Sequence, residues 1–316
     1  MSVPRIVFAG TPDFAVPTLE ALVQAGLPVV GVYTQPDRRV GRGKKLHAPP
    51  VKQCAQAHDL PVYQPDRIRD DLPTLTALAP DLMIVVAYGQ LLTQAVLDVP
   101  TRDTLNVHAS LLPRWRGAAP IQRAIEAGDA TTGVAIMRVM LELDAGPVYR
   151  VGELPIEAAD TTATLHDRLA TLGASLLVET VKALVDADYT LEPTEQDVRD
   201  VTYAHKLSKA EAVIDWQESA AVIARRVRAF VPWPVCQTGL DGLDGPLRVW
   251  AASVAVAPEE APSVAPGTVI AQGQEGVDVM TGDGVLRITR LQAPGRKPVS
   301  AREFVNATPL LHRLLQ

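Results

Sequence analysis

Cysteine is scarce in this sequence, and the two cysteines lie far apart. Only Cys54 and Cys236 occur among 316 residues, and neither belongs to a Cys-x-x-Cys motif. A framework of several disulfides is therefore excluded, and paired-cysteine zinc ligands are missing as well. We expect two ordinary thiols in a reducing compartment, and no metal site.

Long apolar runs are also missing. No stretch reaches the roughly 20 consecutive apolar residues that a membrane helix needs. The N-terminus enters the short apolar run Arg5–Gly10 without a preceding secretory or organelle-targeting pattern. We therefore expect a cytoplasmic protein. Arginine outnumbers lysine, and Ala, Val and Pro are abundant, which favours a bacterial source.

Positive charge is in deficit, since the formal net charge is −6. This balance argues mildly against nucleic acid as a partner. Residues 38–45 nevertheless read Arg-Arg-Val-Gly-Arg-Gly-Lys-Lys, a dense basic segment in an acidic chain. Such a run is commonly a solvated surface, but two glycines make it pliable enough to follow the phosphates of a nucleic acid.

The first half of the chain alternates short apolar segments with helical patterns. The apolar segments predict buried strands at Ile6–Ala9, Val29–Tyr33, Leu82–Ala87, Leu105–His108 and Val134–Met140. Helices are expected after Pro17, near Pro50 and near Pro120, and a long one from Thr161 or Thr162. This alternation is typical of an α/β domain with a Rossmann-like, mostly parallel twisted sheet and helices on both faces.

The second half of the chain has a different pattern of apolar and turn residues. After a short helix around Ala220–Phe230, turn residues separate four expected strands, at Leu247–Val256, Gly267–Ala271, Val277–Thr281 and Val285–Leu291. Short strands at this spacing predict a small, OB-like β-barrel. We expect a catalytic domain over residues 1–190, a polar linker over 191–208 and a C-terminal domain over 209–316.

Two segments contain candidates for ligand-binding or catalytic residues. Gly10-Thr11-Pro12-Asp13-Phe14 follows the first strand but lacks the glycine pattern of a dinucleotide site. In the expected strand Leu105–His108, Asn106 and His108 are two residues apart and therefore share one face. Asparagine can donate to an oxygen that gains negative charge, and histidine can relay a proton.

Asp144 is the third candidate of this site. It follows another apolar strand, so we expect it at the same carboxyl edge of the sheet. Each of the three also has a structural interpretation: a hydrogen-bonded Asn or His in a strand, and an Asp that forms a turn before Ala-Gly-Pro.

Longer motifs resemble a known family. The segment Asn106–Ile121, which reads Asn-Val-His-Ala-Ser-Leu-Leu-Pro-Arg-Trp-Arg-Gly-Ala-Ala-Pro-Ile, is similar to the central signature of the folate-dependent formyltransferases. The likeness continues in Asp144-Ala145-Gly146 and in the N-terminal run Phe8–Pro17. Gln35–Arg38 with Gly41–Lys45, and Tyr203–Leu207 through Trp216, resemble the members of that family that act on methionyl-tRNA.

This resemblance implies a reaction and a role for each catalytic candidate. The donor would be 10-formyltetrahydrofolate, and the acceptor the α-amine of methionyl initiator tRNA, which gives N-formylmethionyl-tRNA for translation initiation. Asn106 would donate to the oxyanion of the tetrahedral intermediate, and His108 would stabilise it or carry the proton. Asp144 would orient the imidazole and favour its charged form. No metal is implied, and we expect a monomer.

The resemblance also implies two binding regions. The folate would lie along the loop Ser110, Leu111, Leu112 and Pro113. Backbone groups near Tyr88 and Gly89 and around Val139–Leu143, including Val139 and Leu141, would hold its pterin ring. The tRNA acceptor end would meet the basic segment through Arg38, Arg42, Lys44 and Lys45. Basic residues of the second half would add contacts to the RNA backbone: Lys206, Lys209, Arg225, Arg226, Arg228, Arg296 and Lys297.

Two other functions stay open at this point. A formyltransferase that acts on a nucleotide-linked amino sugar would share the catalytic trio, but would not need a long basic insertion. A non-enzymatic RNA-binding module would not need the complete set of Asn106, His108 and Asp144.

Overall fold

The computed structural model describes residues 3–40, 45–256 and 263–316, with Val40 and Lys45 described by their backbone only. The chain divides into two compact units. Unit 1 comprises residues 1–120, 131–155 and 166–204, and unit 2 comprises residues 121–130, 156–165 and 205–316. Among the described residues, no helix has the length and apolarity needed to span a membrane.

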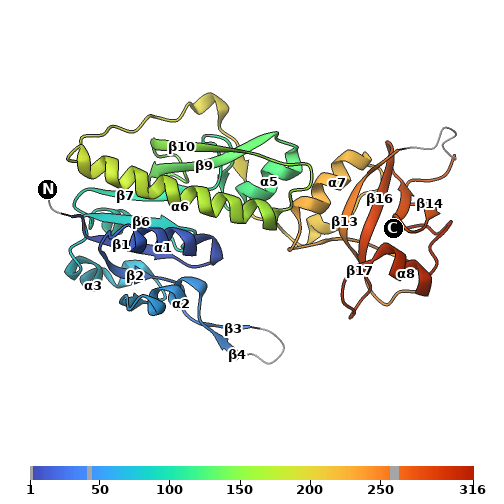
Figure 1. Ribbon diagram of the computed structural model, residues 1–316, viewed down its shortest axis with the longest axis horizontal. Coiled ribbons are helices and arrows are strands. Elements are labelled where there is room, and N and C mark those ends of the chain that lie inside the picture. The colour runs from blue at the N-terminus through green and yellow to red at the C-terminus, as the bar shows by residue number, and fades with distance from the viewer. Residues whose placement is uncertain (1–2, 41–44, 257–262) are drawn as a thin grey trace. The chain divides into compact units, whose positions relative to one another are not determined.

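Unit 1 is built on a seven-stranded sheet with the order β10-β9-β7-β6-β1-β2-β5 (Figure 1). The five strands β5, β2, β1, β6 and β7 are parallel, whereas β9 and β10 are antiparallel to their neighbours. The strand bounds are β1 Ile6–Gly10, β2 Val29–Tyr33, β5 Val62–Tyr63, β6 Leu82–Val86, β7 Asp103–His108, β9 Thr131–Arg138 and β10 Val148–Pro155.

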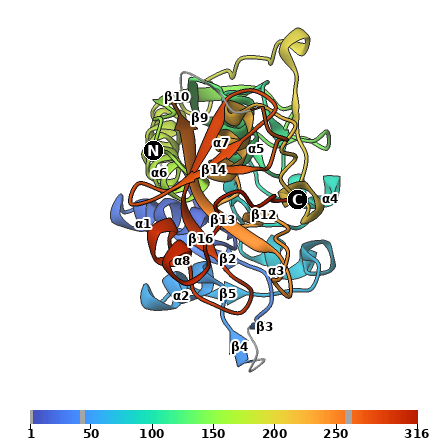
Figure 2. The ribbon, with the colours of Figure 1, turned by 90° about the vertical axis from the view of Figure 1, so that its right-hand side faces the viewer.

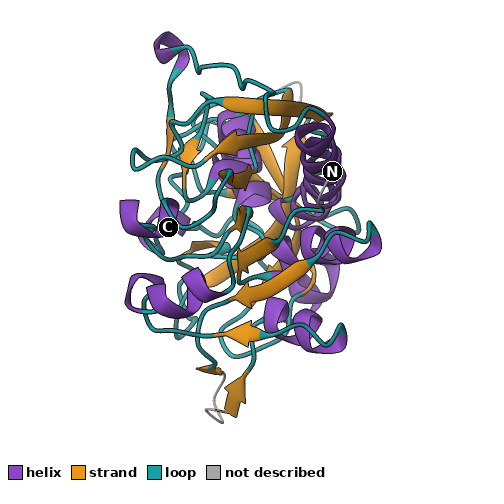
Figure 3. Ribbon diagram, turned by 90° about the vertical axis from the view of Figure 1, so that its left-hand side faces the viewer, coloured by secondary structure: helices purple, strands orange, loops and turns teal. Residues whose placement is uncertain are grey.

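Helices and connecting segments cover both faces of this sheet, as Figure 3 shows. Strand β1 is buried along its whole length, which an apolar parallel strand requires when both faces are covered. The helices are α1 Val16–Gln24, α2 Pro50–Ala57, α3 Leu72–Ala77, α4 Gln94–Leu97 and α6 Thr162–Asp186. Short 3-10 turns lie at Asp13–Ala15, Ile68–Asp70 and Val198–Asp200.

The long helix α6 leaves one face of β7 to the catalytic candidates. At Gly173 of α6, a Cβ atom would come within 2.7 Å of Val107 and 3.4 Å of Val134, so the helix packs closely on that face. Because side chains alternate along a strand, Asn106 and His108 project from the opposite face of β7. The absence of a side chain at Gly173 is what permits the close approach.

Two short ribbons complete unit 1. Strands β3 (Arg38–Val40) and β4 (Lys45–His47) form an antiparallel pair that flanks residues 41–44. Strands β8 (Arg116–Gly117) and β11 (Tyr203–Ala204) pair in parallel, which ties the segment after α6 to the loop after β7.

Unit 2 contains an antiparallel sheet with the order β12-β13-β16-β15-β14, with β17 paired to β16 (Figure 2). The strands are β12 Cys236–Thr238, β13 Leu247–Ala255, β14 Val269–Gln272, β15 Val277–Met280, β16 Val285–Gln292 and β17 Val299–Ser300. The helices are α5 Pro120–Ala127, of which all but Pro120 belongs to this unit, α7 Ala220–Ala229 and α8 Ala301–Ala307, with a 3-10 turn at Ala210–Ala212.

The C-terminal residues close this sheet into a small barrel. Gln316 exchanges backbone hydrogen bonds with Gly239, just after β12. Leu315 donates to Gly267 at 2.9 Å, and Val269 of β14 donates to Arg313 at 2.9 Å. The last residues therefore connect the two edge strands, and the predicted C-terminal barrel is confirmed.

The predicted α/β domain with a mostly parallel sheet is confirmed as well. The five expected strands of the first half and the four of the second all occur, with ends shifted by at most a few residues. Strand β10 is not among the expected strands. It is an edge strand in which partly buried and exposed residues are mixed, so it lacks the apolar run of a buried strand. The domain division at residues 190 and 209 stays a prediction, whereas unit 1 extends to Ala204.

Candidate active site

The active-site candidates Asn106 and His108 lie on β7, whose parallel neighbour is β6 and whose antiparallel neighbour is β9. His108 pairs with Ala135 and Asn106 with Met137 across the β7–β9 ladder. Asn106 is half-buried, and its carboxamide makes no hydrogen bond within the described residues. Its two N–H donors are therefore available to a ligand.

The imidazole of His108 is 6% exposed and has an acceptor near each ring nitrogen. Nε2 lies 2.9 Å from the backbone oxygen of Trp115, and Nδ1 lies 3.7 Å from Oδ2 of Asp144. The second distance is too long for a hydrogen bond, so the carboxylate lies beside the ring without bonding to it directly.

Asp144 lies beside His108, but the path of the chain that brings it there differs from the expected one. We expected both residues at carboxyl ends of parallel strands, but β9 is antiparallel to β7, so its carboxyl end lies beside the start of β7. Val139, just after β9, donates its backbone N–H to Thr104 at 2.8 Å. The loop after β9 then turns back along β7, which places Asp144 beside His108.

The backbone fixes the carboxylate of Asp144. Its Oδ2 accepts a hydrogen bond from the backbone N–H of Gly117 at 2.8 Å. Its φ of 47° lies in the left-handed region, which Asp tolerates better than most residues. The trio predicted from the sequence thus lies in one place, although only part of its geometry follows from strand alternation.

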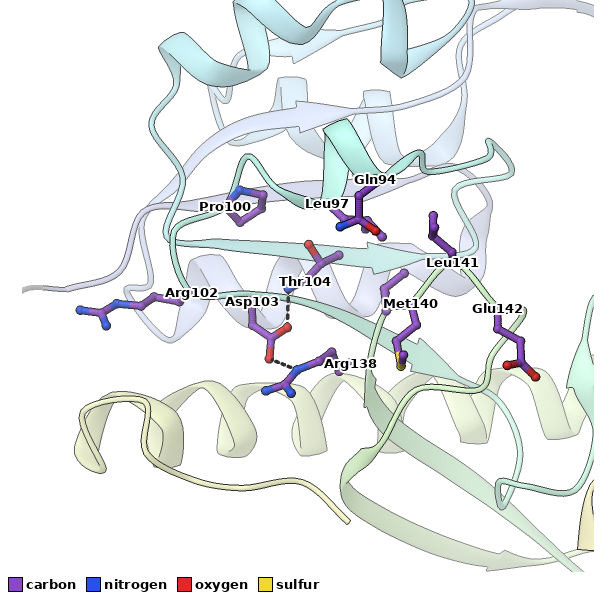
Figure 4. A pocket seen from close by; sticks show the side chains of 11 residues that line it. Gln94, Leu97, Pro100, Arg102, Asp103, Thr104, Arg138, Met140, Leu141 and Glu142 are labelled. Atoms are coloured by element: carbon purple, nitrogen blue, oxygen red, sulfur yellow. Dashed lines mark hydrogen bonds and ion pairs between the residues drawn. The ribbon is translucent and has the colours of Figure 1, made fainter. Parts of the chain in front are cut away.

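A cavity of about 450 Å³ opens beside the start of β7 (Figure 4). Two of the expected folate residues, Val139 and Leu141, line it, and Leu141 is 62% exposed. Met140 and Glu142, which belong to the expected segment Val139–Leu143, also line it, whereas the other lining residues were not predicted: Gln94, Leu97, Pro100, Arg102, Asp103, Thr104 and Arg138. The cavity combines apolar walls with a few polar groups, as is typical of sites for flat heterocycles.

Thr104 is the unpredicted residue with the clearest chemical signal. It is 3% exposed, lines the cavity, and its hydroxyl has no hydrogen-bond partner among the described residues. An unpaired buried hydroxyl is costly, so it indicates a place for a polar ligand atom or water. Strand alternation would have found it, because Thr104 is two residues before Asn106 and shares its face.

The remaining residues that were expected to bind folate lie outside this cavity. Ser110 is fully buried, and its hydroxyl donates to the backbone oxygen of Arg114 at 2.6 Å. The Tyr88 ring belongs to the core, and its backbone oxygen accepts from Thr11 and Gln35. Gly89 is exposed, with a φ of 80°. Leu111, Leu112 and Pro113 are all half-buried. None of these residues lines the cavity.

The residues expected to bind tRNA are only partly described. Arg38 is exposed, and its Nη2 donates to Oε1 of Gln35 at 3.2 Å. Arg42 and Lys44 lie outside the described residues, as does the side chain of Lys45.

The basic residues of unit 2 divide into two groups. Arg225, Arg226 and Arg228 of α7 are half-buried and hydrogen-bond to groups of the same unit, including Glu126 and Asp160. The other group is exposed and forms no ion pair within the described parts of the chain: Lys206, Lys209, Arg296 and Lys297. The exposed group is better suited to contact RNA phosphates.

One group of side chains has the composition of a metal site. Ligand atoms of Glu20, Cys54 and His58 lie within 4.8 Å of one another. Cys54 lies in α2 and His58 caps its C-terminus four residues later, a spacing that places both side chains on one side of the helix. Burial, and then the nearby Glu20 carboxylate, raise the pKa of Cys54 to about 11. Without a metal ion, the thiol is therefore protonated at neutral pH.

The comparisons with known proteins agree with this architecture. The formyl transferase family matches residues 4–181, and the C-terminal domain of formyl transferases matches residues 206–309. The chain belongs to the formyltransferase family. Residues 106–121 and 144, which carry the resemblance, fall within the first match.

The similar proteins align over nearly the whole chain. A methionyl-tRNA formyltransferase from Methylococcus capsulatus is 52% identical over 98% of this chain and 99% of its own length. Another from Chromohalobacter salexigens is 53% identical over 96% of this chain and 93% of its own. The expected family membership is thus confirmed.

Solved structures share the fold at low identity. An N-formyltransferase from Helicobacter canadensis, in complex with folinic acid and dTDP-3-aminofucose, has a TM-score of 0.66 at 15% identity, over 91% of this chain and 99% of its own. HypX from Aquifex aeolicus in complex with tetrahydrofolic acid has a TM-score of 0.63 at 18% identity, covering 98% of this chain and 49% of its own. At these identities the likeness supports the fold alone.

Proposed function

We propose that this protein transfers the formyl group of 10-formyltetrahydrofolate to the α-amine of methionyl initiator tRNA. The observation that carries the choice of acceptor is the identity of about half of all positions with methionyl-tRNA formyltransferases over the full length. The placement of His108 and Asp144 on the face of β7 that also carries Asn106 supports the chemistry.

In this reaction the neutral amine attacks the formyl carbon, and the formyl oxygen becomes an oxyanion. The free carboxamide N–H groups of Asn106 donate to that oxygen, an effect worth roughly 3–4 kcal/mol in the transition state. The bond between carbon and N10 then breaks, the amine nitrogen loses its proton, and N10 gains one. His108 stabilises the oxyanion or carries this proton, and Asp144 orients the ring.

The cavity beside β7 is the proposed site of the pterin ring. Val139 and Leu141 supply apolar wall, and the unpaired hydroxyl of Thr104 supplies a hydrogen bond. A cavity of about 450 Å³ lies within the usual size range of small-molecule sites. In this proposal the rest of the folate lies along Ser110–Pro113, and Tyr88–Gly89 is a further segment that contacts the pterin ring.

The tRNA is proposed to contact the basic segment and the C-terminal barrel. Arg38, Arg42, Lys44 and Lys45 concentrate positive charge in a chain whose net charge is −6. We assign residues 1–190 to catalysis, 191–208 to the linker and 209–316 to tRNA binding, in a cytoplasmic monomer without a metal cofactor.

The test is a formylation assay with purified protein and 10-formyltetrahydrofolate. Charged initiator tRNA and a nucleotide-linked amino sugar are offered in separate reactions. We expect formylmethionyl-tRNA and no formylated sugar. Formylation of the sugar alone would overturn the assigned acceptor, and the absence of any transfer, with retained RNA binding, would favour a binding module.

A further inference from the structure

The polar segment after α6, predicted to be only a linker, returns to the active site. Thr194 and Val148 exchange backbone hydrogen bonds of 2.8 and 2.9 Å, which fixes the segment to the start of β10. Further along, β11 pairs with β8 directly after the catalytic loop. Gln196 lies between these two attachments, and its side chain is half-buried.

The carboxamide of Gln196 makes three hydrogen bonds to the active-site loops. Its Nε2 donates to the backbone oxygens of Asp144 at 2.8 Å and Gly146 at 2.7 Å. Its Oε1 accepts from Nε of Arg116 at 3.1 Å. The two carbonyls require an N–H donor and the guanidinium requires an acceptor, so only one orientation of the amide satisfies all three partners.

The hydrogen bond from Gln196 holds Asp144 in a less favourable backbone conformation. The φ of 47° at Asp144 lies in the left-handed region, which is less favourable for non-glycine residues than extended or helical backbone, although Asp tolerates it better than most. Gln196 binds the carbonyl of Asp144, whereas the N–H of Gly117 binds its carboxylate. Both ends of the residue are therefore fixed, and the carboxylate is held beside His108.

Arg116 joins the same network from the loop after β7. It is 4% exposed, and besides Gln196 it contacts Oε1 of Glu142 at 3.4 Å. The Gln196 amide thus lies between the loop that contains Asp144 and the loop that follows His108. A charged donor to the Gln196 oxygen strengthens this hydrogen bond relative to a neutral one.

We infer that Gln196 is a positioning residue for formyl transfer, which acts by holding the Asp144 loop in its left-handed conformation, with Arg116 fixing the amide. The catalytic consequence rests on the proposed function. The residue touches neither reacting partner in this scheme, and it affects the rate through the distance between Asp144 and His108.

The test replaces Gln196 by methionine, which keeps the length of the side chain and removes all three hydrogen bonds. Because small misplacements of catalytic groups are costly, kcat should fall ~10–100-fold, with KM for tRNA and folate changed less than about threefold. Glu195→Ala is the matched control, since Glu195 is exposed in the same segment. It should leave both constants unchanged.

A double-mutant cycle separates this role from general destabilisation. If Arg116 acts through Gln196, then Arg116→Met with Gln196→Met should lose no more activity than the worse single variant. Multiplied losses would show that the two residues act independently and would overturn the network. Melting temperatures are measured for every variant, and Gln196→Glu, which presents an oxygen to both carbonyls, replaces Gln196→Met if the latter does not fold.

Nuclear magnetic resonance tests the positioning role without any acceptor substrate for the formyl group. The side-chain nitrogen resonances of His108, assigned by comparison with His108→Gln, should shift in Gln196→Met and not in Glu195→Ala. If the wild-type protein fails to formylate methionyl-tRNA while these resonances shift, the proposed function is wrong and the positioning role stands. Unchanged resonances together with an unchanged kcat would refute the positioning role.

Discussion

At the scale of single residues, the active site depends on groups that are left without partners. Asn106 and Thr104 lie on one face of β7, and neither side chain has a hydrogen-bond partner among the described residues. His108 and Asp144, by contrast, are fixed by backbone groups of the following loop. The free donors are suited to a ligand, and the fixed groups to positioning a proton.

Replacing His108 by alanine should lower kcat by ~10²–10⁴-fold, the usual contribution of a general acid or base. The binding of tRNA should change little, because the buried imidazole offers little surface for contacts with RNA phosphates. Steady-state kinetics with a filter-binding assay measure the two effects. A kcat close to that of the wild type would contradict the assigned role.

Thr104→Val removes one hydroxyl from the cavity and preserves the shape of the side chain. We expect KM for the folate to rise about 5–10-fold, as for the loss of one hydrogen bond worth ~1 kcal/mol or slightly more, with KM for tRNA unchanged. Thr101→Val is the control, because that hydroxyl pairs with Asp81 and does not line the cavity. Equal effects of the two substitutions would remove Thr104 from the folate site.

At the scale of elements, close approach between strands and helices depends on a few glycines. Strands β9 and β10 form a tightly paired hairpin in which Gly133 lies opposite Glu153. A Cβ at Gly133 would lie 2.1 Å from the backbone oxygen of Gly152 and 2.5 Å from Leu111. The hairpin and the loop after β7 are therefore packed together at this point.

Gly133→Ala should destabilise the protein by about 1–3 kcal/mol, because the added methyl group meets backbone and must displace it. Thermal or urea denaturation measures the loss. Gly273→Ala is the control, since a Cβ there meets nothing within 4 Å. If both variants melt like the wild type, the β9–β10 pairing is looser than the structure indicates.

At the scale of the whole molecule, charge is distributed unevenly along the chain. The net charge is −6, yet residues 38–45 carry five basic side chains and no acidic one. Phosphate binding by such a segment releases counterions and is therefore sensitive to salt.

Arg42→Leu should raise KM for tRNA and reduce the salt dependence of tRNA binding by about one unit of slope or less, while KM for folate changes little. Binding titrations at several salt concentrations provide the measurement. Arg150→Leu makes the same change of charge on β10, where the exposed arginine pairs with Glu179. A similar loss in both variants would indicate a general effect of charge, not a tRNA contact.

The sequence by itself determined the fold class and most strands, and it indicated the three residues that we propose as the catalytic trio. Runs such as Ile6–Gly10 read as strands because a buried parallel strand must be apolar throughout, and Asn106 and His108 share a face because strand side chains alternate. These features depend on local periodicity, which the sequence displays directly.

Only the tertiary structure decided how the trio is assembled. The direction of β9 relative to β7 depends on long-range pairing, so the return of the 139–147 loop toward His108 could not be predicted. Gln196 and Arg116 are 80 residues apart in the sequence, and nothing local indicates that their side chains meet. Contacts of this kind depend on the packing of distant segments, and they are what fixes Asp144 beside His108.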